Sequence, residues 1–379
     1  MRLCLIANPN SIHTRRWVRH FADLGHDLHL IGEKTLTAQP PAGAAFHDLT
    51  QQNNAAKLRY LVWAQAVRRL VRQIQPDVLH AHQVASAGWL GAAAGFRPLL
   101  VTAWGSDLLL GPARSPMQRQ LARWTLRRAD YITCVSQPLL EAALALGADR
   151  QRIELAPWGV DTTVFRPGDA SAALSMTGEA GPLVLSIRGV QPVYQPLTVA
   201  AAIPLVLARR PDARFMIRTY SADAGLLAEF RRQVAAAGAA DAVAYVGDLP
   251  DDRAIADLYR QAAVVISVPS SDGAPQSVLE AMACGAAPVV SDLPSLRAWV
   301  RQEQEGLLTP VGDAHALADA IVRLLDDPAL HASIRAAAVR LVQQRADRRL
   351  CLARYEAIYQ HLAAGQRPQP TPSISGEKH

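Results

Sequence analysis

The fold is decided by the segment Ser-Ser-Asp-Gly-Ala-Pro-Gln-Ser-Val-Leu-Glu-Ala-Met-Ala-Cys-Gly, residues 270–285. An apolar run at 263–268 precedes it and predicts a buried strand. The segment itself predicts a Gly-Pro turn and then a helix that Gly285 closes. A second apolar run at 287–291 predicts another buried strand. Strand, turn, helix and strand in this order form a βαβ unit, which predicts an α/β fold with a parallel sheet.

The same turn is the candidate binding site of the chain. In parallel α/β sheets, ligands bind outside the carboxyl ends of the strands, where residues 272–277 are expected. Backbone N–H groups at a helix start favour an anion such as a phosphate, and the carboxylates of Asp272 and Glu280 can accept hydrogen bonds from hydroxyls. A phosphate cradle flanked by hydroxyl acceptors suits a sugar nucleotide. The alternative is an ordinary strand–turn–helix in which Glu280 is a solvated helix residue.

The motif also resembles a known signature. An acid at Asp272, seven residues and then Glu-Ala-Met-Ala-Cys-Gly resemble the signature of the family 4 retaining glycosyltransferases, the glycosyl transferases group 1. The first acid of that family is usually Glu, so Asp272 keeps the charge and shortens the side chain by one methylene. The stretch from Pro157 to Phe165 resembles the family's crossing between domains. The resemblance implies the GT-B fold, in which two doubly wound Rossmann-like domains face each other across a cleft.

The length of 379 residues and two successive series of strand and helix signals predict two domains. The stretch 166–182 is polar, contains Gly, Ser and Pro, and is the predicted linker. We expect an N-terminal Rossmann-like acceptor-side domain at 1–165 and a C-terminal Rossmann-like nucleotide-sugar-binding domain at 183–344. The resemblance implies that a helix at 345–363 crosses back to the N-terminal domain. The tail at 364–379 is Pro-, Gln- and Ser-rich and is expected to be disordered.

The composition narrows the class of protein. The formal charge of +6 and the pI of about 9.4 fit either an anionic partner or a solvated Arg-rich surface. The four cysteines are far apart, which indicates neither a zinc site nor a disulfide framework. The first apolar run is too short for a secretory signal, and no stretch has the roughly 18 apolar residues of a membrane span. We therefore expect a cytoplasmic protein whose membrane contact is at most peripheral.

The resemblance implies a donor site in the second domain. Glu280 would bind the donor ribose, and Asp272 with the following turn would hold the sugar hydroxyls and the phosphate. The turn residues concerned are Gly273, Ala274, Pro275, Gln276 and Ser277. Arg188, which ends the first predicted strand of this domain, would stabilise the negative charge on the leaving diphosphate.

One position departs from the family pattern. The family usually places a Lys five residues after the Arg, where this chain has Val193. The neighbouring Tyr194 can donate one hydrogen bond but carries no charge. The departure predicts weaker neutralisation of the phosphates, a different donor, or help from Arg15 or Arg218.

Polar residues also follow the predicted strands of the first domain. The first turn has no Gly-x-Gly-x-x-Gly, which argues against NAD or FAD. The candidates for the acceptor side are His13, Arg15, His82, Trp104 and Asp107. Trp104 stands where the family often has a His that contacts the donor sugar, so its ring either stacks on a sugar or lipid or simply packs. Asp107 either holds an acceptor hydroxyl or caps the next segment.

Two predicted helices, at 57–75 and 116–128, combine several arginines with tryptophan. Such helices can dock on an anionic membrane surface through charge and interfacial aromatic rings. The alternative is a solvated basic face with no partner.

The resemblance implies a retaining glycosyltransferase that moves a sugar from a nucleotide sugar to a saccharide or lipid-linked acceptor and, by analogy with the family, acts in envelope polysaccharide or glycoconjugate synthesis. No metal or other cofactor is expected, because the sequence has no Asp-x-Asp motif and a cationic side chain can serve instead. Two alternatives remain: a catalytically degenerate GT-B protein that binds a nucleotide sugar or a partner transferase, and a sugar-nucleotide 2-epimerase. Nucleic-acid binding is not expected, since no aromatic-basic motif of a known module is present.

Overall fold

The chain forms two α/β units in a computed structural model that describes residues 1–51, 59–169 and 181–370. One unit comprises residues 1–157 together with the chain from 353 onward, and the other comprises residues 158–352. Residues 158–165, which we expected in the first domain, therefore belong to the second unit. Most of the predicted linker, residues 170–180, lies outside the described residues, as do residues 371–379.

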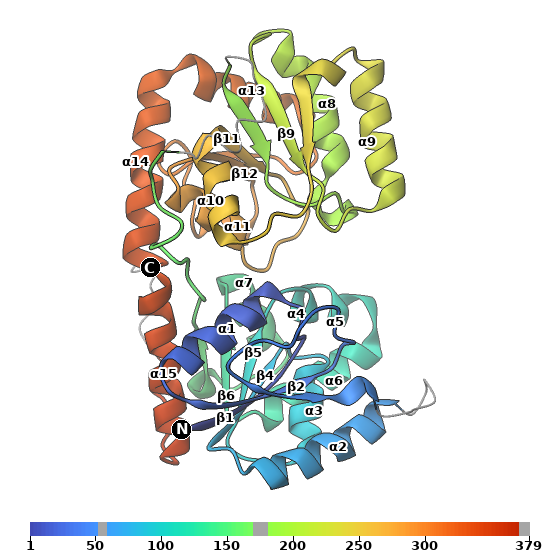
Figure 1. The fold of residues 1–379 in the computed structure, drawn as a ribbon, viewed down its shortest axis with the longest axis vertical. Helices are drawn as coiled ribbons and strands as arrows, with labels where there is room; N and C mark the ends of the chain where they lie inside the picture. Colours follow the sequence, from blue (N-terminus) through green and yellow to red (C-terminus); the bar gives the residue numbers. More distant parts are fainter. Residues whose placement is uncertain (52–58, 170–180, 371–379) are drawn as a thin grey trace. The chain divides into compact units, whose positions relative to one another are not determined.

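The first unit is built on a parallel seven-stranded sheet in the order β3-β2-β1-β4-β5-β6-β7. Its strands are β1 (Arg2–Ala7), β2 (Asp27–Gly32), β3 (Ala45–Asp48), β4 (Val78–His82), β5 (Leu99–Ala103), β6 (Tyr131–Cys134) and β7 (Ile153–Leu155). Its helices are α1 (Ile12–Asp23), α2 (Arg59–Ile74), α3 (Ala87–Ala94), α4 (Ser106–Leu109), α5 (Gly111–Arg114), α6 (Pro116–Arg128) and α7 (Gln137–Ala145). Figure 1 shows these helices around the sheet. The strand order reverses direction between β1 and β4, the switch point of a doubly wound sheet.

The second unit repeats the plan with a parallel six-stranded sheet in the order β10-β9-β8-β11-β12-β13. Its strands are β8 (Leu183–Ser186), β9 (Arg214–Arg218), β10 (Val243–Val246), β11 (Ala262–Ser267), β12 (Ala287–Ser291) and β13 (Leu307–Thr309). Its helices are α8 (Pro196–Leu207), α9 (Ala224–Ala236), α10 (Asp252–Gln261), α11 (Gln276–Ala283), α12 (Pro294–Arg297), α13 (Ala314–Asp326) and α14 (Pro328–Arg345). Here the switch point lies between β8 and β11.

The second sheet is buried on both faces. One apolar cluster packs α8, α9 and α13 against it, and a second cluster packs α10, α11 and α14 against it. Side-chain oxygens of aspartates cap four of these helices by accepting backbone N–H groups, as at Asp313 for α13 and Asp327 for α14. A sheet covered on both faces leaves its strand ends as the places where ligands can reach it.

The last helix, α15 (Arg348–Ala363), begins in the second unit and ends in the first. Its Tyr359 hydroxyl lies 2.7 Å from His80 Nδ1 of β4 and accepts a hydrogen bond from Trp17 Nε1 of α1 at 3.1 Å. The helix therefore contributes to the core of the first unit. No helix in the described ranges is both long and apolar enough to cross a bilayer.

Candidate donor site

The segment that decides the fold lies where the sequence places it, between β11 and β12. The turn after β11 leads into α11, which ends with Gly285 at a φ of +84° and its N–H on the Met282 carbonyl at 3.0 Å. A positive φ favours glycine at this point, so the residue that closes the helix is the one expected. The turn thus stands at the carboxyl end of β11, next to the end of β8 and therefore at the switch point of the sheet.

Arg188 and Asp272 meet at this switch point. Arg188 Nη2 forms an ion pair with Asp272, Nη1 donates to Ser277 Oγ at 2.9 Å, and the guanidinium carbon lies 4.6 Å from the centre of the Tyr194 ring. The side chains of Arg188 and Asp272 are only 12% and 5% exposed. Burial raises the pKa of the Asp272 carboxyl, whereas Arg188 and two backbone N–H groups act in the opposite direction. The structure thus brings two of the three predicted catalytic residues into direct contact.

The backbone of the turn is partly used within the protein. Asp272 accepts backbone hydrogen bonds from Gly273 and Ala274, so these N–H groups point at the carboxylate. The Gln276 side chain donates to the Gly159 carbonyl at 2.7 Å, and Pro275 precedes the first residue of α11. The turn residues therefore shape the site, while the first turn of α11 retains the N–H groups that have no acceptor within the helix.

Glu280 is the third predicted catalytic residue and lies on α11, 5% exposed. Burial and the nearby Glu280 raise the pKa of the Tyr259 phenol. A buried carboxylate beside a neutral phenol differs from the solvated helix residue that the sequence left as an alternative. The carboxylate oxygens of Glu280 are of the kind that accept hydrogen bonds from hydroxyl groups of a ligand.

The position of the missing lysine lies beside Arg188. Val193 and Tyr194 belong to the short turn at Pro192–Tyr194, and the Val193 carbonyl accepts the Ser270 N–H at 2.8 Å. The turn therefore supports the loop that carries Asp272. Arg218, at the end of β9, is 5% exposed and stacks on Tyr220 with 4.8 Å between the guanidinium carbon and the ring centre. Tyr220 and Tyr259 are residues of this site that the sequence did not single out, since neither belongs to a motif.

The acceptor-side candidates divide into two groups in the first unit. His13, His82 and Trp104 come together: the Trp104 ring lies 6.0 Å from that of His13 and 5.2 Å from that of His82. His82 is buried, and burial followed by the charge of His13 lowers its pKa to about 3. Arg15 contacts a different segment, since its Nη2 donates to the Gln39 carbonyl at 2.7 Å.

Asp107 caps its own loop. Its carboxylate accepts the N–H groups of Gly105 at 2.7 Å, Val84 at 2.8 Å and Trp104 at 3.2 Å. Of the two roles that the sequence left open for Asp107, these bonds favour the cap.

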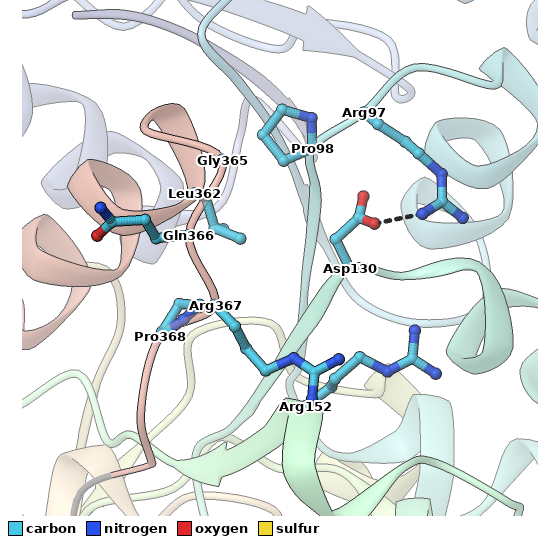
Figure 2. Close-up of a pocket in the computed structure, with 9 residues that line it drawn as sticks. All are labelled: Arg97, Pro98, Asp130, Arg152, Leu362, Gly365, Gln366, Arg367 and Pro368. Atoms are coloured by element: carbon cyan, nitrogen blue, oxygen red, sulfur yellow. Dashed lines mark hydrogen bonds and ion pairs between the residues drawn. The ribbon is translucent and has the colours of Figure 1, made fainter.

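A cavity of about 390 Å³ lies at the opposite edge of the first sheet, where β5, β6 and β7 begin (Figure 2). Its lining includes Arg97, Asp130 and Arg152, together with residues 365–368 of the predicted disordered tail. Arg97 and Asp130 are paired at 2.6 Å, and Arg152 pairs with Asp149 at 2.9 Å. The cavity holds none of the predicted site residues.

Comparison with known proteins identifies the class. A family described as Glycosyl transferase 4-like matches residues 2–136, and one described as Glycosyl transferases group 1 matches residues 183–327. The fold resembles sucrose-phosphate synthase from Thermosynechococcus elongatus with a TM-score of 0.82 and 22% identity, covering 97% of this chain and 100% of that one. It also resembles Anabaena Alr3699/HepE, solved in complex with UDP and glucose, with a TM-score of 0.78 and 19% identity over 94% and 98% of the two chains. The fold is therefore GT-B, as predicted.

Curated relatives agree with this class. A D-inositol 3-phosphate glycosyltransferase of Acidothermus cellulolyticus is 28% identical over 89% of this chain and 82% of its own. One of Nocardia farcinica is 29% identical over 85% and 78%. This chain belongs to the family 4, or group 1, glycosyltransferases and is an enzyme that transfers glycosyl groups. The motif at 272–285 therefore predicted the family correctly.

Proposed function

We propose that this enzyme transfers a sugar from a nucleoside diphosphate sugar to a saccharide or lipid-linked acceptor, with retention at the anomeric carbon. The observation that carries the proposal is the cluster of Arg188, Asp272 and the start of α11 at the switch point of the second sheet. This cluster offers a cation, a carboxylate and helix N–H groups to one ligand. The UDP and glucose bound to the structurally similar HepE support a donor of this kind.

Each group has a role that its chemistry suggests. The buried Glu280 accepts hydrogen bonds from the ribose hydroxyls. Asp272 accepts from hydroxyls of the transferred sugar, and Arg188 binds the diphosphate. Since Arg188 already donates to Asp272 and Ser277, donor binding brings the phosphate into an existing network rather than to an isolated cation.

The proposed reaction uses the leaving group as the base. The bond between the anomeric carbon and the diphosphate oxygen breaks, and the acceptor oxygen bonds to the same face of that carbon. The acceptor proton passes to the released diphosphate oxygen. Arg188 stabilises the negative charge that develops on the diphosphate, an electrostatic effect worth on the order of a few kcal/mol. In this proposal the cationic side chains supply the charge, and no metal ion is required.

The acceptor is the less defined substrate. The curated relatives are named for D-inositol 3-phosphate, which makes a phosphorylated polyol one acceptor to test beside saccharides and lipid-linked saccharides. The cluster of His13, His82 and Trp104 lies at the carboxyl edge of the first sheet and offers an aromatic surface to such an acceptor. The biological role that we propose is envelope polysaccharide or glycoconjugate synthesis.

We also propose that the enzyme works in the cytoplasm and touches the membrane with α2 and α6. These helices pack on either side of α3 and present the exposed residues Arg68, Arg69, Arg119, Arg127 and Arg128. The exposed apolar side chains of Leu61 and Met117 lie on the same two helices. Co-sedimentation with phosphatidylcholine vesicles, with and without phosphatidylglycerol, tests this: binding should require the anionic lipid and weaken with salt.

The donor proposal is tested first by thermal stabilisation of the purified protein with UDP, GDP and their common sugar conjugates. Selective stabilisation by one sugar nucleotide supports the donor site, and turnover with candidate acceptors then follows by NMR of the anomeric proton. Conversion of the donor without any acceptor would indicate a 2-epimerase. No stabilisation by any of these ligands, in a protein that unfolds cooperatively, would contradict the proposed donor site.

A further inference from the structure

The cation of the proposed donor site is already paired. The charge of Arg188 is matched by that of Asp272. A nucleoside diphosphate would bring further negative charge into the same space. The family Lys that would offset this charge is absent, because its position holds Val193.

Arg218 lies on the strand next to the one that carries Arg188. Strands β8 and β9 are parallel neighbours with Ser186 opposite Ile217, so the two arginines leave adjacent strands at the same edge of the sheet. The backbone segments that follow these two strands approach each other closely. A Cβ on Gly189 would meet the Tyr220 carbonyl oxygen at 2.4 Å, so only glycine fits beside this backbone.

The charges of both arginines act on the Tyr220 phenol. Arg218 stacks on Tyr220, and burial raises the pKa of the Tyr220 phenol against the opposing charges of Arg188 and Arg218. The charge of Arg218 also reaches Tyr259, the neighbour of Glu280. Arg188, Arg218 and Glu280 therefore border one region at the carboxyl edge of the sheet.

Arg218 is a buried cation without an acidic partner among the described residues. It is 5% exposed, its Nε has no hydrogen-bond partner, and within the described ranges it makes neither an ion pair nor a side-chain hydrogen bond. Burial of a charged group is unfavourable unless an opposite charge or hydrogen-bond acceptors accompany it. By contrast, the guanidinium of Arg188 in the same unit is paired with the carboxylate of Asp272. An anion beside Arg218 would supply the acceptor that the described residues do not.

We propose that Arg218 is the second cation that binds the donor diphosphate, in place of the lysine that position 193 lacks. This inference rests on the proposed function, since the ligand is the diphosphate of that donor. Arg218 approaches the phosphates from β9, whereas a lysine at 193 would approach from the turn after β8. In this proposal the second positive charge at the diphosphate is kept, but it comes from β9 instead of the turn after β8.

The test compares binding of UDP and GDP with binding of uridine and guanosine by calorimetry. Arg218→Gln should lower the affinity for the nucleoside diphosphate that the wild type binds by about 10- to 100-fold. This is the range expected for a lost charge-assisted hydrogen bond. Affinity for the matching nucleoside should stay the same. Arg214→Gln, at the amino end of the same strand, is the matched control and should leave both affinities unchanged.

Two further measurements separate ligand binding from a structural role. Without ligand, Arg218→Gln should be at least as stable as the wild type, because the change removes an unpaired buried charge. In the double variant Arg218→Gln/Val193→Lys, the lysine should restore at least tenfold of the lost diphosphate affinity. A lower melting temperature of Arg218→Gln with unchanged diphosphate affinity would show a structural residue and overturn the inference.

The outcomes also separate this inference from the proposed function. If the wild type binds UDP or GDP and Arg218→Gln binds it equally well, only the role of Arg218 is wrong. If the wild type binds neither diphosphate, the proposed donor site is wrong and the inference is overturned with it. If Val193→Lys restores nothing, Arg218 does not take the place of that lysine.

Discussion

The guanidinium of Arg188 and the carboxylate of Asp272 form an ion pair between residues 84 positions apart in the sequence, and both side chains are almost closed to solvent. Removal of one partner from a buried pair leaves an uncompensated charge, which typically costs about 3–5 kcal/mol. We therefore expect Asp272→Asn to lower the free energy of unfolding by about 3 kcal/mol, measured by denaturant titration. Asp292→Asn is the control, because its pair with Arg297 is 35% and 58% exposed and should cost about 1 kcal/mol or less. Equal costs for the two variants would contradict a strong buried pair.

Asp272 should also matter more for turnover than for nucleotide binding. In the proposed function its carboxylate faces the transferred sugar, whereas the nucleotide contacts other groups. Asp272→Asn should therefore lower kcat by about tenfold or more, the effect of a lost charged hydrogen bond, and leave the Kd of UDP or GDP within a few fold. A large loss of nucleotide affinity with unchanged kcat would reverse this assignment.

Glu280 offers a test of the ribose contact. A hydrogen bond from a hydroxyl to a charged carboxylate contributes roughly 1.5–3 kcal/mol to the binding free energy. Replacing the buried Glu280 by Gln should therefore lower the affinity for the nucleoside diphosphate by about tenfold or more. The matched ligand is the 2′,3′-dideoxynucleoside diphosphate, which lacks both ribose hydroxyls. The variant and the wild type should bind this ligand with similar affinity in calorimetry. A loss of the same size with both ligands would mean that Glu280 does not contact the ribose.

The two histidines at the end of β4 predict a loss of stability in acid. Burial lowers the pKa of His80 well below its usual value, and burial together with His13 lowers that of His82 to about 3. The unfolded chain binds protons below about pH 6.5, while the folded chain does not, so this stability is complete above pH 6.5 and is lost as the pH falls. Each histidine contributes a slope of about 1.4 kcal/mol per pH unit.

The variant His82→Phe removes one of the two titrating imidazoles. Its ring fits among Trp17, His80 and Trp104, and it cannot titrate. Denaturant titrations from pH 8 to pH 4 should show a stability that falls less steeply than that of the wild type, by about 1.4 kcal/mol per pH unit below pH 6. Identical slopes would show that His82 is protonated in the folded chain.

Asp107 should act on stability rather than on the acceptor. Asp107→Ala leaves the N–H groups of Val84, Trp104 and Gly105 without their acceptor, and at about 1–3 kcal/mol for each unsatisfied group the free energy of unfolding should fall by roughly 3 kcal/mol. The folded fraction of the variant enzyme should keep a KM for the acceptor close to that of the wild type. A stable variant with a raised acceptor KM would instead assign Asp107 to the acceptor.

The sequence predicted the elements of the second unit well because its signals are local. Hydrophobic runs mark the buried strands, and the acid, helix and glycine at 272–285 follow one another within a single βαβ unit. The turn at 272–277 was also predicted to follow the carboxyl end of a buried strand, where it lies, since the topology of parallel sheets fixes where strand ends meet.

What the sequence left open depends on contacts between distant residues. No spacing indicates that Arg188 pairs with Asp272 or that the Gln276 side chain binds the Gly159 carbonyl. Nor does any spacing indicate that neither ring nitrogen of His82 has a hydrogen-bond partner in the part of the chain that the structure describes. The same holds for the boundary of the first unit. Val160 pairs with residues 346–348, far along the chain, and a change in composition along the sequence cannot reveal this pairing.

The helix α15 carries one more pair that can be tested. Arg354 donates to both carboxylate oxygens of Glu154 on β7, at 2.9 and 2.7 Å, and the Glu154 side chain is almost fully buried. Arg354→Met should lower the free energy of unfolding by about 3 kcal/mol, because it leaves a buried carboxylate without its cation. Arg349→Met on the same helix is the control, since that side chain is 76% exposed and its pairing with Asp347 is 3.7 Å long. The double variant Glu154→Leu/Arg354→Met should recover part of the loss, since two apolar side chains avoid the buried charge. If Arg354→Met and Arg349→Met unfold at the same denaturant concentration, the pair does not hold α15 to the first sheet.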